Sequence, residues 1–482
     1  MNLHLMRIYA ASPLRVQQMA ILAFGWYWRY RRFGRAFHRL VQEYLERESW
    51  SAEQLRAYAE ARLREQVLRA WREIPYYRHR FAEHGITETQ LERLTLAELP
   101  RLPLLDRNVL RTQPKSLLTR TARMFPPRSF YSSGTTGRPA RVYFRRLTHQ
   151  HNMAVREARC FRWAGVSQLD PRAVVGAKTI VPSAEAPPPY WRFNRVEHQL
   201  YLSLHHISLK NIPDYVSALN RFQPVVLEGL PSGLYFLARF IREAGLEVHR
   251  PKAVITMGEK LEAHMRAEIE AVFGARTWEE YGSVENCVLA TECEHGRMHV
   301  HLDFGILELI GADGQPVRPG EIGETVVTGL ANRDQILIRL RLGDLAAWAT
   351  EACPCGRNQF PPLADLYGRV CDAMVMPDGR RVAMANVFVG LDEVWEGQLV
   401  QQELNKFLLL VVPTAKYSER CREVLGERMR RLFGSGVRYE IRVVNEIPLG
   451  PGGKKRGIVC LLPPELTGPI HTSCDLRDEQ MS

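Results

Sequence analysis

The segment Tyr131-Ser-Ser-Gly-Thr-Thr-Gly-Arg-Pro139 is the stretch from which the fold and the chemistry of this chain can be worked out. Gly134 and Gly137 permit backbone conformations that other residues avoid, so successive N–H groups can turn toward one anion. The segment adds hydroxyl groups and one cation, from Ser132, Ser133, Thr135, Thr136 and Arg138. These donors suit a triphosphate, whereas composition alone would favour a flexible Ser/Gly loop. The Gly-Lys-Ser/Thr ending of a Walker-type phosphate loop is missing.

Length and charge bound the class of protein. At 482 residues the chain is too long for one core, which predicts two or three domains. A hydrophobic content of 45% and a charged content of 24% are ordinary for a globular protein. The formal net charge of +12 indicates an anionic partner. Because the arginines that carry this charge are spread along the chain, phosphate-bearing small molecules explain it as well as nucleic acid does. We expect no nucleic-acid partner.

The cysteines and the N-terminal segment bear on the cellular location of the protein. Nine cysteines, scattered without a disulfide spacing, predict reduced thiols in a cytoplasmic protein. The apolar run Met19 to Trp28 is shorter than the roughly 20 residues that cross a bilayer, and no secretory signal is evident. Arginines follow it, so residues 19–35 could form an amphipathic helix on a membrane surface. A helix packed on the main domain is the commoner use of such a segment. Nothing in the sequence indicates the oligomeric state.

Local patterns divide the chain into three parts. Residues 1–90 read as a helical extension, with Ser51 and Gln54 forming a capping box and Ile74-Pro75 ending the helix that follows. Short apolar strands then alternate with helices, which predicts an α/β sheet in a large domain over 91–369. The strands and helices expected there lie at 141–144, 174–175, 225–227, 232–244, 253–256 and 261–273, with a smaller β element at 320–329.

A boundary is expected near Gly368-Arg-Val-Cys-Asp372. Beyond it, strands near 406–412 and 437–444 and a helix near 419–432 predict a small α+β lid domain over 370–482. The fold class is therefore α/β: a large N-terminal domain with a small β element, and a small, mobile α+β C-terminal domain. The polar tail after Pro463 is expected to be poorly ordered.

Four further motifs carry chemistry. Tyr281-Gly-Ser-Val-Glu285 places a carboxylate where it could hold Mg²⁺ beside a triphosphate. Asp344 follows a glycine turn and could accept both hydroxyls of a ribose, and Arg369 offers a guanidinium to the same ribose or a phosphate. Gly450-Pro-Gly-Gly-Lys-Lys-Arg456 could deliver a lysine to an anion. Each motif alone is more often structural, and their order along the chain makes them specific.

In this order the motifs resemble those of the adenylate-forming superfamily of acyl-CoA synthetases. The closer resemblance is to its phenylacetate–CoA ligase-like branch, which includes capsule-biosynthesis adenylating proteins. The matching landmarks run from residue 131 to residue 456: YSSGTTGRP, TMGEK around Gly258-Glu259, EYGSVE, RLRLGD, GR at 368 and GGKKR at 453. One departure is visible, because Arg138 stands where the family usually has lysine, and a planar guanidinium does not place its charge identically.

The resemblance implies a role for each motif. The hydroxyl loop would hold the β and γ phosphates of ATP, through Ser132, Ser133, Gly134, Thr135, Thr136, Gly137 and Arg138. The adenine and its surroundings would be contacted by Gly258, Glu259, Tyr281, Gly282 and Ser283. Glu285 would ligate Mg²⁺, Asp344 would bind the ribose hydroxyls, and Arg369 would assist at the ribose and mark the hinge. Lys454 would bridge the substrate carboxylate, the α-phosphate and the ribose. Lys454, Glu285 and Thr135 would be the catalytic residues.

The implied activity is ATP-dependent activation of a carboxylic acid to an acyl-adenylate, followed by transfer to coenzyme A. The resemblance implies that the substrate is an aryl or arylacetic acid. One alternative is transfer to an amine or another non-CoA acceptor in polysaccharide or natural-product biosynthesis. A second is a catalytically silent, membrane-associated scaffold of the same fold. The histidine pair His205-His206 and the aromatic residues Trp191, Phe193 and Tyr235 could line the acyl pocket, although core packing is the commoner role.

A separate set of residues suits a metal. Cys353-Pro-Cys355 with the remote Cys293 matches a tetrahedral structural Zn²⁺ site of three sulfurs and one nitrogen. Such a site recurs in the branch that the chain resembles, and the GxxH context indicates His299 as the nitrogen ligand. His295 and His301 remain alternatives, and ordinary reduced cysteines are the other interpretation.

Overall fold

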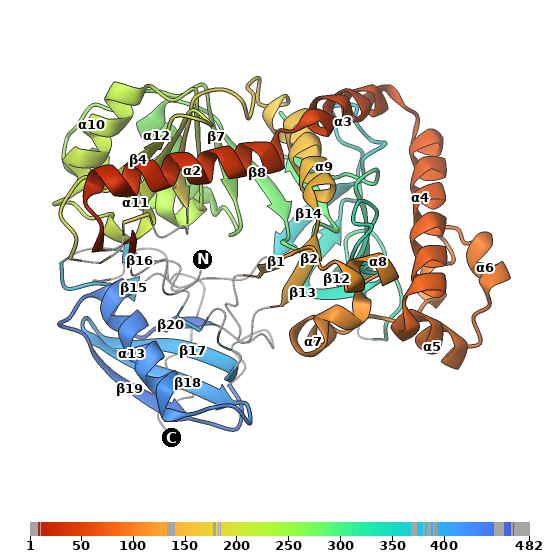
Figure 1. The fold of residues 1–482 in the computed structure, drawn as a ribbon. Helices are drawn as coiled ribbons and strands as arrows, with labels where there is room; N and C mark the ends of the chain where they lie inside the picture. Colours follow the sequence, from red (N-terminus) through yellow and green to blue (C-terminus); the bar gives the residue numbers. More distant parts are fainter. Residues whose placement is uncertain are drawn as a thin grey trace.

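The computed structural model describes residues 8–9, 11–132, 140–176, 180–181, 183, 185–311, 313–367, 374–378, 381–382, 387–388, 391, 393–447, 457–463 and 466. A helical N-terminal part, a large sheet flanked by helices and a small C-terminal α+β part follow one another along the chain (Figure 1). This is the expected fold class.

The N-terminal part is built of helices: α2 (Leu14–Arg32), α3 (Arg35–Glu46), α4 (Ala52–Glu73), α5 (Pro75–Glu83) and α6 (Glu88–Glu92), with a 3-10 turn at Arg47–Ser49. The capping box of α4 is confirmed, because Ser51 accepts from the Gln54 N–H and the Gln54 side chain accepts from the Ser51 N–H. Pro75 occupies the first turn of α5, where its missing N–H costs no helical hydrogen bond.

These helices belong to the core of the large domain. Ala59, Leu63 and Val67 on α4 are fully buried and pack in one cluster with Val327 and Ile336 of the sheet region. Removing apolar surface from water stabilises the folded state by about 25 cal/mol per Å², so this shared core stabilises the contact between α4 and the sheet. No helix in the described ranges is long and apolar enough to cross a membrane.

Short helices connect this part to a β-hairpin. They are α7 (Arg107–Thr112), α8 (Arg120–Met124) and 3-10 turns at Leu99–Arg101 and Pro114–Leu117. The hairpin strands β1 (Arg128–Tyr131) and β2 (Arg141–Phe144) are antiparallel, with Tyr131 opposite Arg141. Tyr131 and Ser132, at the start of the hydroxyl-rich segment, therefore lie at the end of the first strand of a hairpin, of which the sequence predicted only the second strand. Helix α9 (Arg146–Arg156) follows and continues into a π-helical turn at Glu157–Phe161.

One sheet of twelve strands forms the centre of the large domain, in the order β11-β12-β13-β14-β10-β9-β8-β7-β6-β3-β5-β4. One half contains the parallel strands β3 (Arg172–Gly176), β5 (Gln199–Ser203), β6 (Val226–Gly229), β7 (Ala253–Met257) and β8 (Thr277–Gly282), with β4 (Trp191–Asn194) antiparallel at the edge. The helices of this half are α10 (Ile212–Phe222), α11 (Pro231–Glu243) and α12 (Ala263–Phe273), with a 3-10 turn at Leu204–His206. The buried strands and alternating helices predicted here are confirmed.

The other half is antiparallel. Its strands are β9 (Leu289–Glu292), β10 (Met298–Val300), β11 (Gly305–Ile310), β12 (Ile322–Gly329), β13 (Leu340–Trp348) and β14 (Pro362–Tyr367). The β element predicted at 320–329 is therefore part of the same sheet and not a separate unit. Continuity arises because β8 pairs with parallel β7 on one side and with antiparallel β9 on the other.

The C-terminal part has its own hydrophobic cluster, which runs from Met374 to Ile458. Its elements are β15 (Met374–Val375), β16 (Arg381–Val382), β17 (Val394–Glu403), β18 (Lys406–Pro413), α13 (Glu419–Phe433), β19 (Arg438–Val443) and β20 (Ile458–Cys460). Ser435 contacts the large domain by donating its backbone N–H to Glu185 at 2.6 Å. The boundary expected at 368–372 lies entirely outside the described residues.

Candidate active site

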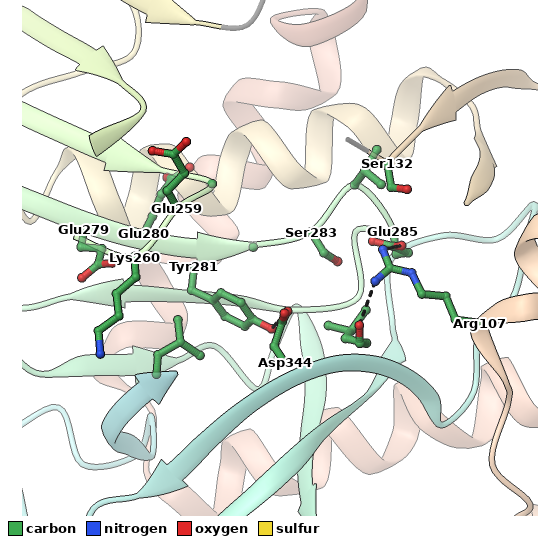
Figure 2. Close-up of a pocket in the computed structure, with 15 residues that line it drawn as sticks. Arg107, Ser132, Glu259, Lys260, Glu279, Glu280, Tyr281, Ser283, Glu285 and Asp344 are labelled. Carbon is green, nitrogen blue, oxygen red and sulfur yellow. Dashed lines mark hydrogen bonds and ion pairs between the residues drawn. The ribbon is translucent and has the colours of Figure 1, made fainter. Parts of the chain in front are cut away.

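A cavity of about 280 Å³ lies where β7, β8 and β13 come together (Figure 2). Its lining residues are Arg107, Ser132, Gly258, Glu259, Lys260, Glu279, Glu280, Tyr281, Gly282, Ser283, Val284, Glu285, Leu342, Asp344 and Leu366. Four segments that the sequence singled out separately, around residues 132, 258, 281–285 and 344, therefore share one cavity.

The base of the hydroxyl loop is fixed next to this cavity. The Ser132 N–H donates to the Ala140 carbonyl at 3.0 Å, and the Ala140 N–H donates to Ser132 Oγ at 2.9 Å. These two hydrogen bonds hold the ends of the segment together. Several predicted site residues lie outside the described residues: Ser133, Gly134, Thr135, Thr136, Gly137, Arg138, Arg369 and Lys454.

Gly258 and Glu259 follow the carboxyl end of β7. Gly258 has φ +82°, a conformation that favours glycine, and a Cβ there would lie 3.2 Å from Leu230. Glu259 accepts hydrogen bonds from the Ser232 N–H at 3.1 Å and the Ser232 hydroxyl at 2.6 Å, in the first turn of α11. Burial raises the pKa of Glu259 above its ordinary value, and the two Ser232 hydrogen bonds oppose that shift. The helix N-terminus therefore holds this carboxyl group in place.

Two acidic residues of β8 border the cavity without having been predicted. Glu280 is buried, accepts a hydrogen bond from Arg156 and forms an ion pair with it. Arg156 also pairs with Glu228 at 2.8 Å. Glu279 accepts from the Leu261 N–H at 3.0 Å. Burial raises the pKa of Glu279 to about 7, with a smaller contribution from the nearby charge of Glu292. Glu280 belongs to the landmark EYGSVE, but that motif assigned it no role, and nothing in the local sequence distinguished Glu279 from an ordinary acidic residue of a strand.

Tyr281 and Asp344 come together across the cavity. The Tyr281 hydroxyl donates to Asp344 Oδ2 at 3.0 Å, and Figure 2 shows the ring pointing at that carboxylate. Burial and the charge of Asp344 both raise the pKa of Tyr281, which stays a neutral donor. A β-bulge turns Asp344 to this side, because Leu342 to Asp344 lie opposite Thr325 alone and Gly343 adopts φ +80°.

Glu285 is the most buried carboxylate that the motifs predicted, at 1% exposure. Its Oε1 accepts from Arg107 Nη2 at 2.9 Å, and Arg107 Nη1 donates to the Leu342 carbonyl at 2.8 Å. Within the described part of the chain, Glu285 Oε2 and Ser283 Oγ are buried without a hydrogen-bond partner. A buried carboxylate oxygen left in that state fits a divalent cation, which prefers oxygen ligands.

Arg107 was not predicted. It lies 178 residues from Glu285 in sequence, in the first turn of the short helix α7. Asp106 caps α7 directly before it, and no local pattern links two residues that lie so far apart in the sequence.

A second cluster lies away from the cavity. The ligand atoms of Cys293, His299, Cys353 and Cys355 all lie within 4.8 Å of one another. The Cys293 and Cys353 sulfurs are 3.6 Å apart, and Cys355 Sγ is 3.3 Å from His299 Nε2. These are the four residues predicted as zinc ligands, on the turn after β9, on β10 and in the loop before β14.

The surroundings of the cluster fit a metal. His299 Nδ1 lies 2.7 Å from the Phe360 carbonyl, and a hydrogen bond there leaves Nε2 free for a ligand bond. Backbone N–H groups of His295 and Arg357 donate to the sulfurs of Cys293 and Cys355 at 3.4 Å each. Three thiols and one imidazole are a donor set typical of structural Zn²⁺.

The alternative histidines do not join this cluster. His295 is exposed, and His301 Nε2 lies 2.7 Å from the Thr291 hydroxyl. His206 lies 2.7 Å from the Ser203 hydroxyl, and its ring stacks on Tyr190 with centroids 4.9 Å apart. Trp191, Phe193 and Tyr235 pack in the hydrophobic cluster of the parallel half of the sheet. Packing is thus the observed role of these aromatic residues and of His206.

The chain is similar in sequence to one domain family and to several known proteins. Residues 374–460 match the family of the CapK C-terminal domain. The chain is 25% identical to Protein CapK of Staphylococcus aureus over 374 residues, which cover 76% of this chain and 81% of that protein. It is 27% identical to the phenylacetate-coenzyme A ligase of Thermus thermophilus over 353 residues, which cover 69% and 74%.

Solved structures agree on the fold. A 2-hydroxyisobutyryl-CoA ligase in complex with 2-HIB-AMP and CoA aligns with a TM-score of 0.54 at 22% identity, covering 86% of this chain and 91% of that one. The same ligase in its postadenylation state aligns with a TM-score of 0.53 at 22% identity over the same shares. In sequence the chain is thus similar to CapK and to phenylacetate–CoA ligases, and it shares its fold with a 2-hydroxyisobutyryl-CoA ligase, which is consistent with the resemblance to adenylate-forming enzymes.

Proposed function

We propose that the protein is an AMP-forming ligase that activates a carboxylic acid with MgATP. The observation that carries this proposal is the pairing of two sites in one cavity. Glu285 presents a buried carboxylate oxygen without a partner in the described chain, and Asp344 is oriented by Tyr281. The first suits a metal bound to phosphates, and the second suits the hydroxyls of a ribose. Relatives named as coenzyme A ligases support the same reaction.

In the proposed reaction a carboxylate oxygen attacks the α-phosphorus of ATP in line. The bond between the α-phosphorus and the bridging oxygen breaks, and pyrophosphate leaves. Residues of the hydroxyl loop would hold the β and γ phosphates, and Glu285 would hold Mg²⁺. Lys454 would offset the charge on the transferring phosphoryl group, which is the main contribution that a protein makes to phosphoryl transfer.

The second half-reaction would transfer the acyl group to coenzyme A. The C-terminal part would rotate about the segment at 369–372, withdraw Lys454 and admit the thiol. The thiolate would attack the acyl carbon, and AMP would leave. Within this reaction we propose an aryl or arylacetic acid as the substrate, in line with the relatives named as phenylacetate–CoA ligases.

A second candidate is transfer to an amine or another non-CoA acceptor. The observation that favours it is that residues 374–460, the part proposed to face the acceptor, match the CapK C-terminal domain. Both candidates share the adenylation step, so the first experiment tests that step alone.

ATP–pyrophosphate exchange with a panel of aromatic and aliphatic acids tests adenylation. We expect exchange with at least one acid and a loss of several orders of magnitude in Lys454→Ala. Lys455→Ala is the matched control, because it removes the neighbouring charge and should keep most of the exchange. No exchange with any acid would instead support the catalytically silent scaffold. Equal exchange in both variants would refute the role of Lys454.

The acceptor is tested separately. With an active acid, we expect coenzyme A to accelerate AMP release and to yield a thioester that mass spectrometry detects. Adenylate formation without any acceleration by coenzyme A, but with acceleration by an amine or a sugar nucleophile, would favour the second candidate. A cytoplasmic location, where ATP and coenzyme A are available and thiols stay reduced, belongs to the same proposal.

A further inference from the structure

We propose that the outer face of helix α2 docks on an anionic lipid bilayer. Helix α2 lies across the near side of the α/β half of the molecule as one unbroken helix (Figure 1). Its outward residues Val16, Met19, Trp26 and Tyr30 follow one another at steps of three, seven and four positions, which places them on a single helix face. Met19 and Trp26 are each 68% exposed and Tyr30 is 65% exposed.

The inner face of α2 is already occupied by the large domain. Gln17 accepts from Arg192, Arg31 donates to the Phe144 carbonyl at 2.7 Å, and Trp28 packs edge-on against His149. Gly25 permits close contact, because a Cβ there would lie 2.1 Å from the Asn194 side chain. A helix seated in this way needs only one apolar face. Packing within the described chain therefore does not account for the outward apolar stripe formed by Val16, Met19, Trp26 and Tyr30.

The charged residues of α2 itself are all arginines. Seven arginines precede Glu43, the first acidic residue of the chain, at positions 7, 15, 29, 31, 32, 35 and 39. Arg15 and Arg29 are exposed on α2 itself. Arg128 and Arg146 reach α2 from other elements: Arg128 donates to the Tyr27 hydroxyl at 2.6 Å, and the Arg146 guanidinium lies 4.1 Å from the Tyr30 ring centroid.

These arginines remain available for anions outside the molecule. Arg29 donates to the Val196 carbonyl at 3.2 Å, and Arg128 and Arg146 contact aromatic side chains. Among the described residues, none of Arg15, Arg29, Arg128 and Arg146 forms an ion pair with a carboxylate. Each such cation near an anionic leaflet adds to the attraction of the surface.

The chemistry of the stripe favours a bilayer over a protein partner. Tryptophan and tyrosine concentrate at membrane interfaces, where an apolar ring and a polar tip are both satisfied. The stripe runs along the outer side of one continuous helix, so a flat surface can contact it over its full length. A helix that lies in the interface plane needs apolar residues on one side and flanking cations, which α2 presents.

Docking through α2 would also place the catalytic cavity near the bilayer. Arg128, which contacts Tyr27 of α2, begins strand β1, and Ser132 of the cavity directly follows that strand. The docked face and the cavity are thus joined through four residues of one strand.

Flotation with lipid vesicles tests the proposal on the full chain. We expect binding to vesicles of phosphatidylcholine with phosphatidylglycerol, little binding to phosphatidylcholine alone, and weakening at high salt. The triple variant Met19→Ser/Trp26→Ser/Tyr30→Ser should lose binding about tenfold or more, as should Arg15→Gln/Arg29→Gln. Ile322→Ser, at a 54% exposed position on β12, and Arg420→Gln, exposed on α13, are the matched controls and should bind like the parent.

Two results would overturn the proposal. One is the absence of binding to either kind of vesicle, or binding that neither α2 variant weakens while both retain the thermal melting curve of the parent. The other is a dimer in sedimentation velocity that the triple variant dissociates, since a second copy would then cover the stripe. Lipid binding is read without adenylation, so failure of the proposed function leaves this test intact.

Discussion

Arg107 Nη2 lies 2.9 Å from Glu285 Oε1, so a guanidinium holds one oxygen of the carboxylate proposed to ligate Mg²⁺. The Glu285 side chain is fully buried and that of Arg107 is 16% exposed. A buried carboxylate without a compensating charge is costly, and the arginine supplies that charge in the protein by itself. The second oxygen of Glu285 would be the one offered to a metal.

Arg107→Ala is expected to destabilise the protein by about 3 kcal/mol, since removing one partner of a buried pair leaves the other uncompensated. Mg²⁺ with ATP should restore more stability to this variant than to the parent, because the metal replaces the lost charge. Thermal unfolding with and without MgATP measures both effects. Arg111→Ala, on the same short helix, is the control and should show neither; an equal MgATP shift in all three proteins would contradict the role of Glu285.

Tyr281→Phe removes the hydrogen bond that orients Asp344. A hydrogen bond to a charged group is worth about 1.5–3 kcal/mol, and part of it should survive because Thr325 still donates to the Asp344 backbone carbonyl. We expect the KM for ATP in pyrophosphate exchange to rise about threefold to tenfold, with a larger rise in Asp344→Asn. Asp313→Asn, on the β11–β12 connection, should leave the KM unchanged. A fall in kcat without a rise in KM would assign the pair a different role.

Zinc content tests the cluster of Cys293, His299, Cys353 and Cys355. We expect about one zinc per purified chain, because three thiolates and one imidazole complete a tetrahedral site. Cys353→Ala/Cys355→Ala should lose the metal and lower the unfolding midpoint by several degrees. Elemental analysis and thermal unfolding measure the two effects.

The control for this experiment is Cys421→Ser, in the hydrophobic cluster of the C-terminal part, which should retain zinc even if its stability falls. A parent protein with well under one zinc per chain and freely titratable thiols would exclude the site.

Glu279 should make stability depend on pH. Its pKa is raised from 4.5 to about 7, chiefly by burial, so the folded state binds this proton more tightly than the unfolded state does. The resulting stabilisation is full below about pH 4.5 and is lost as the pH rises through about 7. Glu279→Gln keeps an acceptor for the Leu261 N–H and has no charge to bury. It should therefore be more stable than the parent at pH 8, by up to about 3 kcal/mol.

Urea denaturation of both proteins from pH 5 to pH 8, in roughly unit steps, measures this difference. The exposed Glu351→Gln serves as the control and should follow the parent at every pH. If the difference between Glu279→Gln and the parent does not grow with pH, the carboxyl group is not held protonated by the fold.

Local sequence patterns determined much of the architecture. The capping box at Ser51 and Gln54, the buried strands β6 and β7 and the helices α11 and α12 were all predictable, since each follows from periodicity or from contacts within four residues. Cys353-Pro-Cys355 also indicated a metal site, because two thiols one residue apart necessarily lie close together.

Tertiary structure decided the contacts between distant segments. It selected His299 over His295 and His301, brought Tyr281 to Asp344 across 63 residues, and brought Arg107 to Glu285 across 178. It also seated one face of α2 on the large domain and left the other exposed. The physical reason is that periodicity fixes which residues share a face of one element. Which two faces meet depends on how the whole core packs, and no local pattern records that choice.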